Sequence, residues 1–140
     1  MDWYGVLFQS NSTGNLVQCD VRYATSGVSA EAASIHISGC VIRDFRLRGI
    51  YVVGTMSNLD TPFVTVDHSY VGQSTPSEQN KGEGIYIYRN AEVLVTNSRI
   101  TGCLNGVRLL AYCSYRPQFT VRECNIQNNA ALGILAATSG

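Results

Sequence analysis

The chain has 140 residues, which suits one domain, and its ten Lys and Arg residues balance its ten Asp and Glu residues. That balance argues against a nucleic-acid-binding protein, because such proteins rely on an excess of positive charge. Apolar residues make up 45% of the chain, enough for a core, yet no apolar run approaches the ~20 residues that span a bilayer. We therefore expect a single domain over residues 1–140, with neither a nucleic-acid partner nor a membrane span.

Short strands are predicted at six places where Gly precedes a strand-forming run. In chain order these glycine phrases are GVLF at Gly5, GVSA at Gly27, GIYV at Gly49, GIYI at Gly84, GVRL at Gly106 and GILA at Gly133. Three of the five gaps between them are 22 residues, and the others are 35 and 27. Such regular spacing predicts a repeat protein.

A second phrase, apolar-x-x-Cys/Ser-x-apolar, lies between consecutive glycine phrases. Its five copies are LVQCDV ending at Val21, ISGCVI at Ile42, VDHSYV at Val71, VTNSRI at Ile100 and VRECNI at Ile126. Two phrases in strict alternation favour a solenoid, in which each coil stacks on the one before. Hairpins are the competing interpretation, with Asn105–Gly106 as their best turn, but a meander does not require this alternation.

Equivalent residues of successive coils are expected to align in columns about 4.8 Å apart. Ile50, Ile85 and Val107 are predicted to fill the interior. Small residues are predicted to form one column at a tight corner: Cys19, Cys40, Ser69, Ser98 and Cys124. Gly is expected at each strand entry, where the chain turns sharply or needs positive φ. Longer loops are expected where the repeat is interrupted, at 54–62, 73–83 and 110–117.

These phrases resemble the right-handed parallel β-helix family, the pectate-lyase-like fold, and the opening WYGVLF resembles the entry coil of such proteins. The resemblance covers roughly residues 3–137 and implies an all-β, right-handed parallel β-helix of about five coils, a short or truncated member. It implies little about activity, because this fold carries lyases, hydrolases and non-catalytic surface modules. It also suggests an extracellular or cell-surface location, although no secretory leader opens this chain.

A candidate ligand-binding face follows from the strand alternation. The residue after each inward Ile or Val should face solvent, which stacks Tyr51, Tyr86 and Arg108, with Tyr88 and Arg89 beside them. Aromatic rings supply apolar area and phenol and guanidinium groups supply hydrogen bonds, so these five residues are predicted to contact an extended carbohydrate. The plainer interpretation is that Tyr favours exposed strand positions and stabilises its neighbours by ~0.2–1 kcal/mol.

A catalytic site is the alternative. Enzymes of the resembling family use clustered carboxylates, and the acidic residues expected nearest the face are Asp60, Glu83 and Glu92, with Arg108 as a cation. A calcium-assisted lyase could be assembled from these, and calcium would enter only in that case. However, no two carboxylates are adjacent and no Gly-His-Gly occurs. We therefore predict no catalytic residue, cofactor or metal site.

Other polar residues receive structural interpretations. The cluster RDFRLR, Arg43 to Arg48, could contact an anionic glycan, but a solvated turn is the favoured interpretation. His36 is predicted to face outward from a strand and His68 to lie at a corner. The five cysteines are odd in number and contain no C-x-x-C pair, which favours buried thiols over a disulfide framework or a zinc site.

The prediction is thus a non-catalytic β-helical module that binds carbohydrate or serves as a structural or adhesive surface element. A polysaccharide lyase or glycoside hydrolase is the alternative. Neither end of the sequence shows an amphipathic segment that would cover an exposed coil. We therefore expect a homo-oligomer or contact with neighbouring β-helix coils, because open coil edges are templates for association.

Overall fold

The computed structural model describes residues 3–57, 59–75 and 79–139, and it contains strands but no helix in that part of the chain. Sheet 1 contains β1 (Val6–Phe8), β4 (Ser26–Glu31), β7 (Arg48–Val53), β10 (Glu83–Tyr88), β13 (Asn105–Tyr112) and β16 (Leu132–Ser139). Sheet 2 contains β2 (Thr13–Val17), β5 (Ser34–Ser38), β8 (Phe63–Asp67), β11 (Glu92–Thr96) and β14 (Gln118–Arg122). Sheet 3 contains β3 (Asp20–Arg22), β6 (Val41–Arg43), β9 (Tyr70–Gly72), β12 (Arg99–Thr101) and β15 (Asn125–Gln127).

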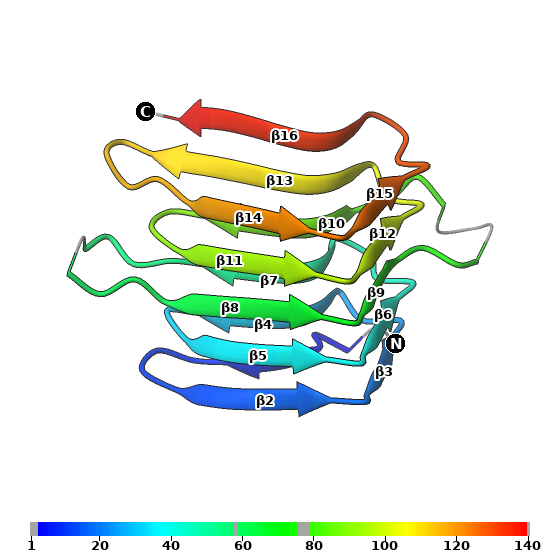
Figure 1. Ribbon diagram of the computed structural model, residues 1–140, viewed down its shortest axis with the longest axis horizontal. Helices are drawn as coiled ribbons and strands as arrows, with labels where there is room; N and C mark the ends of the chain where they lie inside the picture. The colour runs from blue at the N-terminus through cyan, green and yellow to red at the C-terminus, as the bar shows by residue number, and fades with distance from the viewer. Residues whose placement is uncertain (1–2, 58, 76–78, 140) are drawn as a thin grey trace.

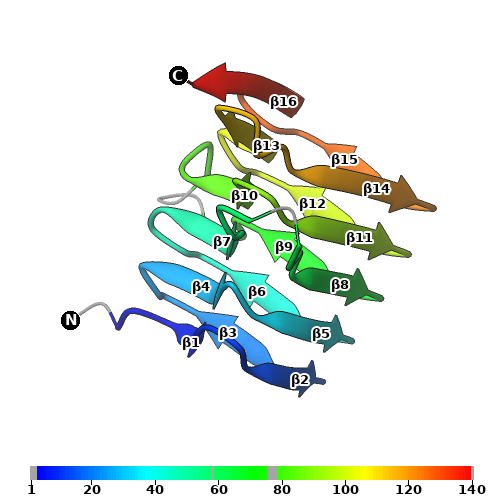
Figure 2. The same cartoon turned by 90° about the vertical axis from the view of Figure 1, so that its left-hand side faces the viewer.

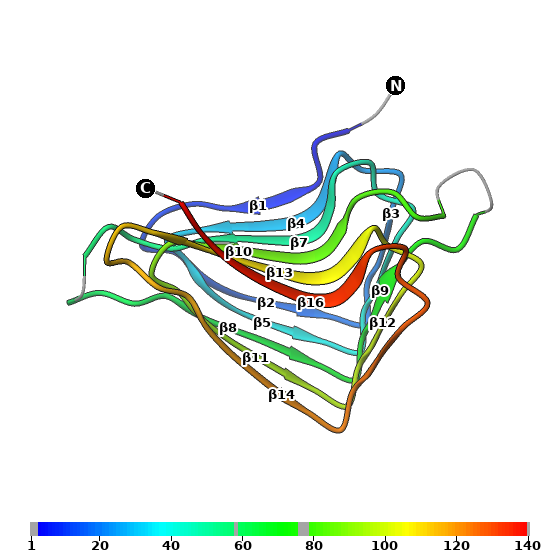
Figure 3. The ribbon, with the colours of Figure 1, turned by 90° about the horizontal axis from the view of Figure 1, so that it is seen from above.

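The chain winds through sheets 1, 2 and 3 in turn, and each strand pairs in parallel with its equivalent in the next coil. Five coils result, and β16 begins a sixth (Figure 1). Figure 2 shows the coils stacked from β1–β3 at one end to β14–β16 at the other. Seen along the stack, the three sheets form the sides of a triangle (Figure 3). The predicted all-β parallel solenoid is confirmed, and the hairpin interpretation is wrong.

The interior is a set of apolar columns that run from coil to coil. In sheet 1, Ile50 pairs with Ile85 and Ile85 with Val107, and all three are fully buried. Val64 and Val93 continue the same arrangement in sheet 2. This confirms the predicted interior. It also explains why period-two alternation survives in strands as short as three residues, since each inward side chain meets its equivalent above and below.

The glycine column exists because neighbouring coils approach closely there. A Cβ atom on Gly49 would lie 2.5 Å from Val71 Cγ1 and 2.6 Å from the carbonyl oxygen of Gly84. Of the six repeated glycines only Gly5 has a positive φ. Of the two expected reasons, positive φ therefore applies to Gly5 alone. At Gly27, Gly49, Gly84 and Gly106 an added Cβ would lie within 2.7 Å of the next glycine's carbonyl oxygen, so lack of a side chain is the requirement there.

The predicted corner of small residues is confirmed, and its hydroxyls join the coils. The backbone N–H of Cys40 donates to Ser69 Oγ over 3.1 Å, and that of Ser69 donates to Ser98 Oγ over the same distance. The sharp change of direction occurs one residue earlier, in a left-handed column: Gln18, Gly39, His68, Asn97 and Glu123. Sequence reasoning placed His68 at a corner but missed Gln18 and Glu123, because Gln and Glu are not typical of that conformation.

Loops vary in length while the strands keep register. The β7–β8 loop occupies 54–62 as predicted, and the β9–β10 loop occupies 73–82; residue 58 and residues 76–78 lie outside the described part. The third loop is shorter than the predicted 110–117, because β13 continues to Tyr112. Asp44, which is 4% exposed, holds the second loop by accepting hydrogen bonds from Ser74 N and Thr75 N over 2.7 and 2.9 Å.

Candidate ligand-binding face

The outer surface of sheet 1 brings together all five residues predicted to contact a ligand. Parallel register places Tyr51 beside Tyr86 and Tyr86 beside Arg108, on β7, β10 and β13. Tyr88 lies two residues along β10, and Arg89 follows it directly. We call this surface the tyrosine face; it comprises Arg48, Tyr51, Glu83, Tyr86, Tyr88, Arg89, Arg108 and Tyr112.

Tyr51 and Tyr86 stack on one another, with ring centroids 5.4 Å apart and planes inclined by 27°. The Arg48 guanidinium carbon lies 4.1 Å from the Tyr51 centroid and 5.2 Å from that of Tyr86, and Arg108 approaches Tyr86 at 5.2 Å. Such cation–π contacts each contribute about 0.5–1 kcal/mol at exposed sites. Because the rings face one another along the stack, those ring faces are shared between coils.

Arg48 is the residue of this face that sequence reasoning missed. Its interpretation as part of a solvated turn is wrong, because Arg48 begins β7 and its guanidinium lies over the Tyr51 ring. The available signal was its position immediately before a glycine phrase, which puts it in register with Glu83 on the next coil. A turn-like composition concealed that position.

The second row of the face continues beyond the Tyr51–Tyr86 stack. The Arg89 guanidinium lies 4.9 Å from the Tyr88 centroid, and Tyr112 meets Tyr88 edge to face with centroids 6.1 Å apart. A hollow of about 380 Å³ adjoins this row; it is lined by Ser10, Glu31, Ala32, Tyr51, Val53, Gly54, Tyr88 and Arg89. The face therefore combines a flat stack with a shallow depression at one end.

A buried carboxylate lies at the other end of the face. Arg108 Nη1 donates to Glu83 Oε1 over 3.2 Å, and the Glu83 side chain is only 11% exposed. Glu83 Oε2, Arg108 Nε and Asn105 Oδ1 are buried without a hydrogen-bond partner. Burial also raises the pKa of the Tyr51 phenol, so Tyr51 stays a neutral hydrogen-bonding group at physiological pH.

The structure does not gather the acidic residues of the catalytic alternative. Glu83 begins β10, whereas Glu92 lies beyond its far end and faces outward on sheet 2, so about 17 Å of strand separates them. Asp60 lies in the loop that leaves β7 at that same far end. Only Glu83 meets Arg108, and no group of three His, Cys, Asp or Glu residues in the described ranges could hold a metal ion.

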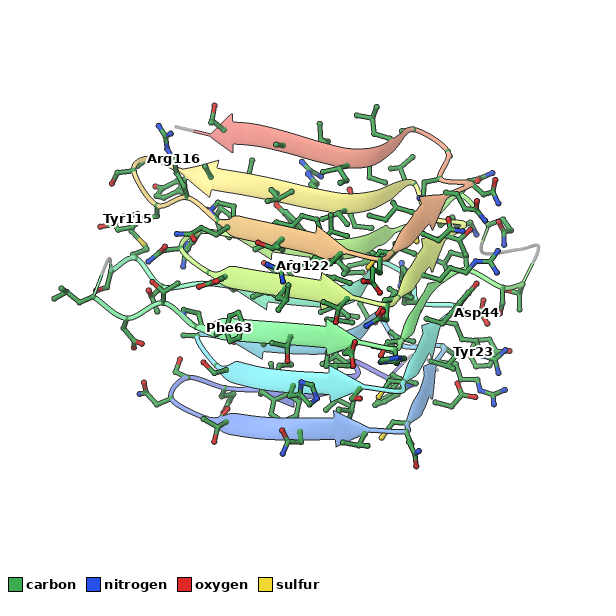
Figure 4. All side chains as sticks on the ribbon, viewed as in Figure 1. Tyr23, Asp44, Phe63, Tyr115, Arg116 and Arg122 are labelled. Atoms are coloured by element: carbon green, nitrogen blue, oxygen red, sulfur yellow. The ribbon has the colours of Figure 1, made fainter. Side chains whose placement is uncertain are left out.

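The histidines lie away from this face, whereas the loop after β13 begins beside it, because the backbone of Tyr112 is hydrogen-bonded to that of Tyr115. His36 is exposed on β5, where its Nδ1 contacts Thr65 Oγ1, and His68 is at a corner, as predicted. Figure 4 shows Tyr115 and Arg116 at the turn between β13 and β14, on the opposite side of the molecule from Tyr23 and Asp44. All five cysteines are free thiols, and Cys40 and Cys103 are buried.

Stacked parallel coils, a repeating interior and a flat outer face define a β-solenoid of the β-helix class. The family model described as right handed beta helix region matches residues 4–140, so the chain belongs to the right-handed β-helix family. Searches of curated proteins and of solved structures gave no match. Across the residues that the structure describes, no helix has the length and apolar character needed to cross a membrane.

Proposed function

We propose that this protein is a non-catalytic β-helical module whose tyrosine face binds an extended carbohydrate. The supporting observation is the Tyr51–Tyr86 stack with Arg48 and Arg108 against its rings. It lines up phenol hydroxyls and guanidinium groups along the solenoid axis, at about 4.8 Å per coil. A polymer lying along that axis would meet a donor at each of the three successive coils that carry Tyr51, Tyr86 and Arg108.

The contacts expected of this face differ from those that the sequence suggested. Because Tyr51 and Tyr86 each turn one ring face to the other, a sugar ring cannot stack on those two faces. Ring edges, phenol hydroxyls and guanidinium N–H groups are the contacts available, and these favour hydroxyl and carboxylate groups of a ligand. Three arginines on this face, Arg48, Arg89 and Arg108, outnumber the two carboxylates near them, those of Glu31 and Glu83. The face therefore carries a small excess of positive charge, which suits an acidic glycan.

A binding experiment with matched variants tests this proposal. The full chain is titrated with neutral polysaccharides and with uronic-acid polymers, with and without calcium. Tyr86→Ala should weaken binding about tenfold, equivalent to about 1.4 kcal/mol. The control is Tyr70→Ala, because Tyr70 is also half-buried but lies on sheet 3, away from the tyrosine face. Arg89→Asn should also weaken binding while retaining a residue that tolerates the left-handed conformation found there.

Chain cleavage is followed in the same samples. Release of reducing ends, or ultraviolet absorbance from unsaturated ends, would show turnover and overturn the non-catalytic assignment in favour of a lyase or hydrolase. Absence of binding to every polymer would refute the carbohydrate proposal. Equal losses of affinity in Tyr86→Ala and Tyr70→Ala would show that the ligand binds outside the tyrosine face.

We also propose that the end coils mediate self-association, which suits a structural or adhesive element. The supporting observation is the exposure of interior-column residues at the β14–β16 end. Ile134, in the column of the fully buried Val107, is 46% exposed, and Val121, in that of Val95, is 39% exposed. Sedimentation of the 140-residue chain should show species larger than a monomer at high micromolar concentration, and a clean monomer would refute this part.

A further inference from the structure

Cys19 and Cys40 are stacked neighbours in the column of small corner residues, on coil 1 (β1–β3) and coil 2 (β4–β6). β3 pairs with β6 so that Asp20 lies beside Val41, and each cysteine directly precedes one residue of that pair. The backbone N–H of Val41 donates to the carbonyl oxygen of Cys19 over 2.8 Å, so the register includes the two cysteines. Equivalent Cα atoms of adjacent coils lie about 4.8 Å apart, within the range that a disulfide spans.

The two thiols lie on the same side of the backbone. Cys40 belongs to the buried apolar cluster, and Cys19 packs against that cluster from coil 1. Cys40 Sγ reaches from coil 2 to coil 1, where it donates to the carbonyl oxygen of Leu16 over 3.2 Å. Burial raises the pKa of the Cys40 thiol, and its side-chain hydrogen bond with Cys19 acts in the same direction. The sulfur atoms are therefore direct neighbours between the two coils.

The other three cysteines have no cysteine beside them in the stack. Cys124 belongs to the same column, but the residue stacked on it is Ser98, because Arg99 pairs with Asn125. Cys103 lies between β12 and β13, and the exposed Cys113 lies in the loop after β13. Cys19 and Cys40 are thus a single pair rather than part of a disulfide framework.

Access from solvent differs between the two thiols of the pair. Cys19 is half-buried, whereas Cys40 is 1% exposed. A reagent in solution therefore reaches Cys19 first, and the Cys40 thiol is placed to react with whatever has been attached to Cys19. This order suits thiol–disulfide exchange, in which an accessible thiol forms a mixed disulfide and a second thiol resolves it.

We propose that Cys19 and Cys40 are a site of reversible oxidation, which a low-molecular-weight disulfide such as glutathione disulfide converts to a disulfide within the chain. The Cys19 thiolate attacks one sulfur of glutathione disulfide, which forms a mixed disulfide and releases one glutathione. The Cys40 thiol then loses its proton and attacks the Cys19 sulfur, which releases the second glutathione. Two electrons pass from the two cysteines to the glutathione disulfide, and the two protons end on the released thiols.

The disulfide would fasten coil 1, which packs against coil 2 alone within the described residues. Two apolar side chains of coil 1, Leu7 and Val17, are about half exposed, so this coil is held by fewer contacts than an internal one. The bridge closes a loop that contains β3, β4 and β5. Closing such a loop removes conformations from the opened chain and thereby disfavours opening, so oxidation should hold coil 1 in place.

Oxidation of the folded chain tests the site. The full chain carrying Cys113→Ser, which lacks the exposed thiol, is incubated with glutathione disulfide and then analysed by intact mass and peptide mapping. The product should be lighter by two hydrogen atoms and should contain Cys19 joined to Cys40. Adding Cys124→Ser, in the same column, should change nothing, whereas adding Cys19→Ser should leave Cys40 a free thiol. A mixed disulfide that persists at Cys19, or a bridge that forms only after unfolding in urea, would overturn the proposal.

Limited digestion with trypsin tests the effect of the bridge on coil 1. Cleavage after Arg22, which is exposed on β3, should be at least about fivefold slower in the oxidised protein, because β3 must leave β6 to enter the protease. Cleavage after Arg122, exposed on β14 at the other end of the solenoid, is the internal control and should not change. Equal rates after Arg22 in the oxidised and reduced proteins would show that the bridge does not hold coil 1 and would overturn that part of the proposal.

Discussion

Replacing Gly49 by Ala should destabilise the fold, because the coils approach most closely along the glycine column. The added methyl group would lie 2.5 Å from Val71 Cγ1, 2.6 Å from the Gly84 carbonyl oxygen and 2.7 Å from Phe45 Cε1. Val71 and Phe45 are fully buried, so neither can move away without disturbing the core. Overpacking of this kind costs about 3 kcal/mol, and the reduced freedom of the unfolded chain offsets about 0.7 kcal/mol of it.

The net loss of about 2 kcal/mol in unfolding free energy corresponds to a fall of about 7 °C in Tm for a chain of this length. Thermal and urea unfolding are followed by circular dichroism, at concentrations low enough to keep the chain monomeric. Gly133→Ala is the matched control in the same column, and its Tm should change by less than about 2 °C because the added Cβ would meet only Ile126 Cγ2, at 3.7 Å. Equal effects at the two positions would show that close approach of coils is not the reason for glycine there.

Three further predictions concern titratable groups. Hydrogen bonds from Thr96, His68 and Asn97 hold the pKa of Asp67 below its ordinary 3.8, so its stabilisation is present above about pH 4 and is lost as the pH falls. The urea concentration at the midpoint of unfolding should therefore drop between about pH 5 and 2, and it should drop less steeply in Asp67→Asn. The same dependence of the midpoint on pH in both proteins would contradict this. Asp44→Ala should cost about 2 kcal/mol and increase proteolysis within the 73–82 loop, whereas unchanged cleavage there would show that Asp44 does not anchor it. Burial raises the pKa of Cys103 to about 12, so at pH 8 a thiol reagent should label the exposed Cys113 first and reach Cys103 only on unfolding; early labelling of Cys103 would contradict its burial.

Much of the site was predictable because strand alternation and coil register are local properties of a repeat. The glycine phrases alone place Tyr51, Tyr86 and Arg108 in one outward column, and the structure pairs them in that order. What the phrases could not show is that Tyr51 and Tyr86 cover one another's ring faces, because that depends on side-chain rotation between coils. Whether this face binds carbohydrate stays a prediction.

The sequence by itself determined the coil, its interior and the order of residues along each column. Two phrases recurring in alternation favour stacked coils over hairpins, because stacking buries each inward Ile and Val against its equivalent in the next coil. The tertiary structure alone decided which side chains meet: that Arg48 lies over Tyr51 within β7, that Glu83 pairs with Arg108 on the next coil, and that Glu92 faces away. These arrangements depend on side-chain rotation, loop paths and side-chain volumes, which no local pattern records.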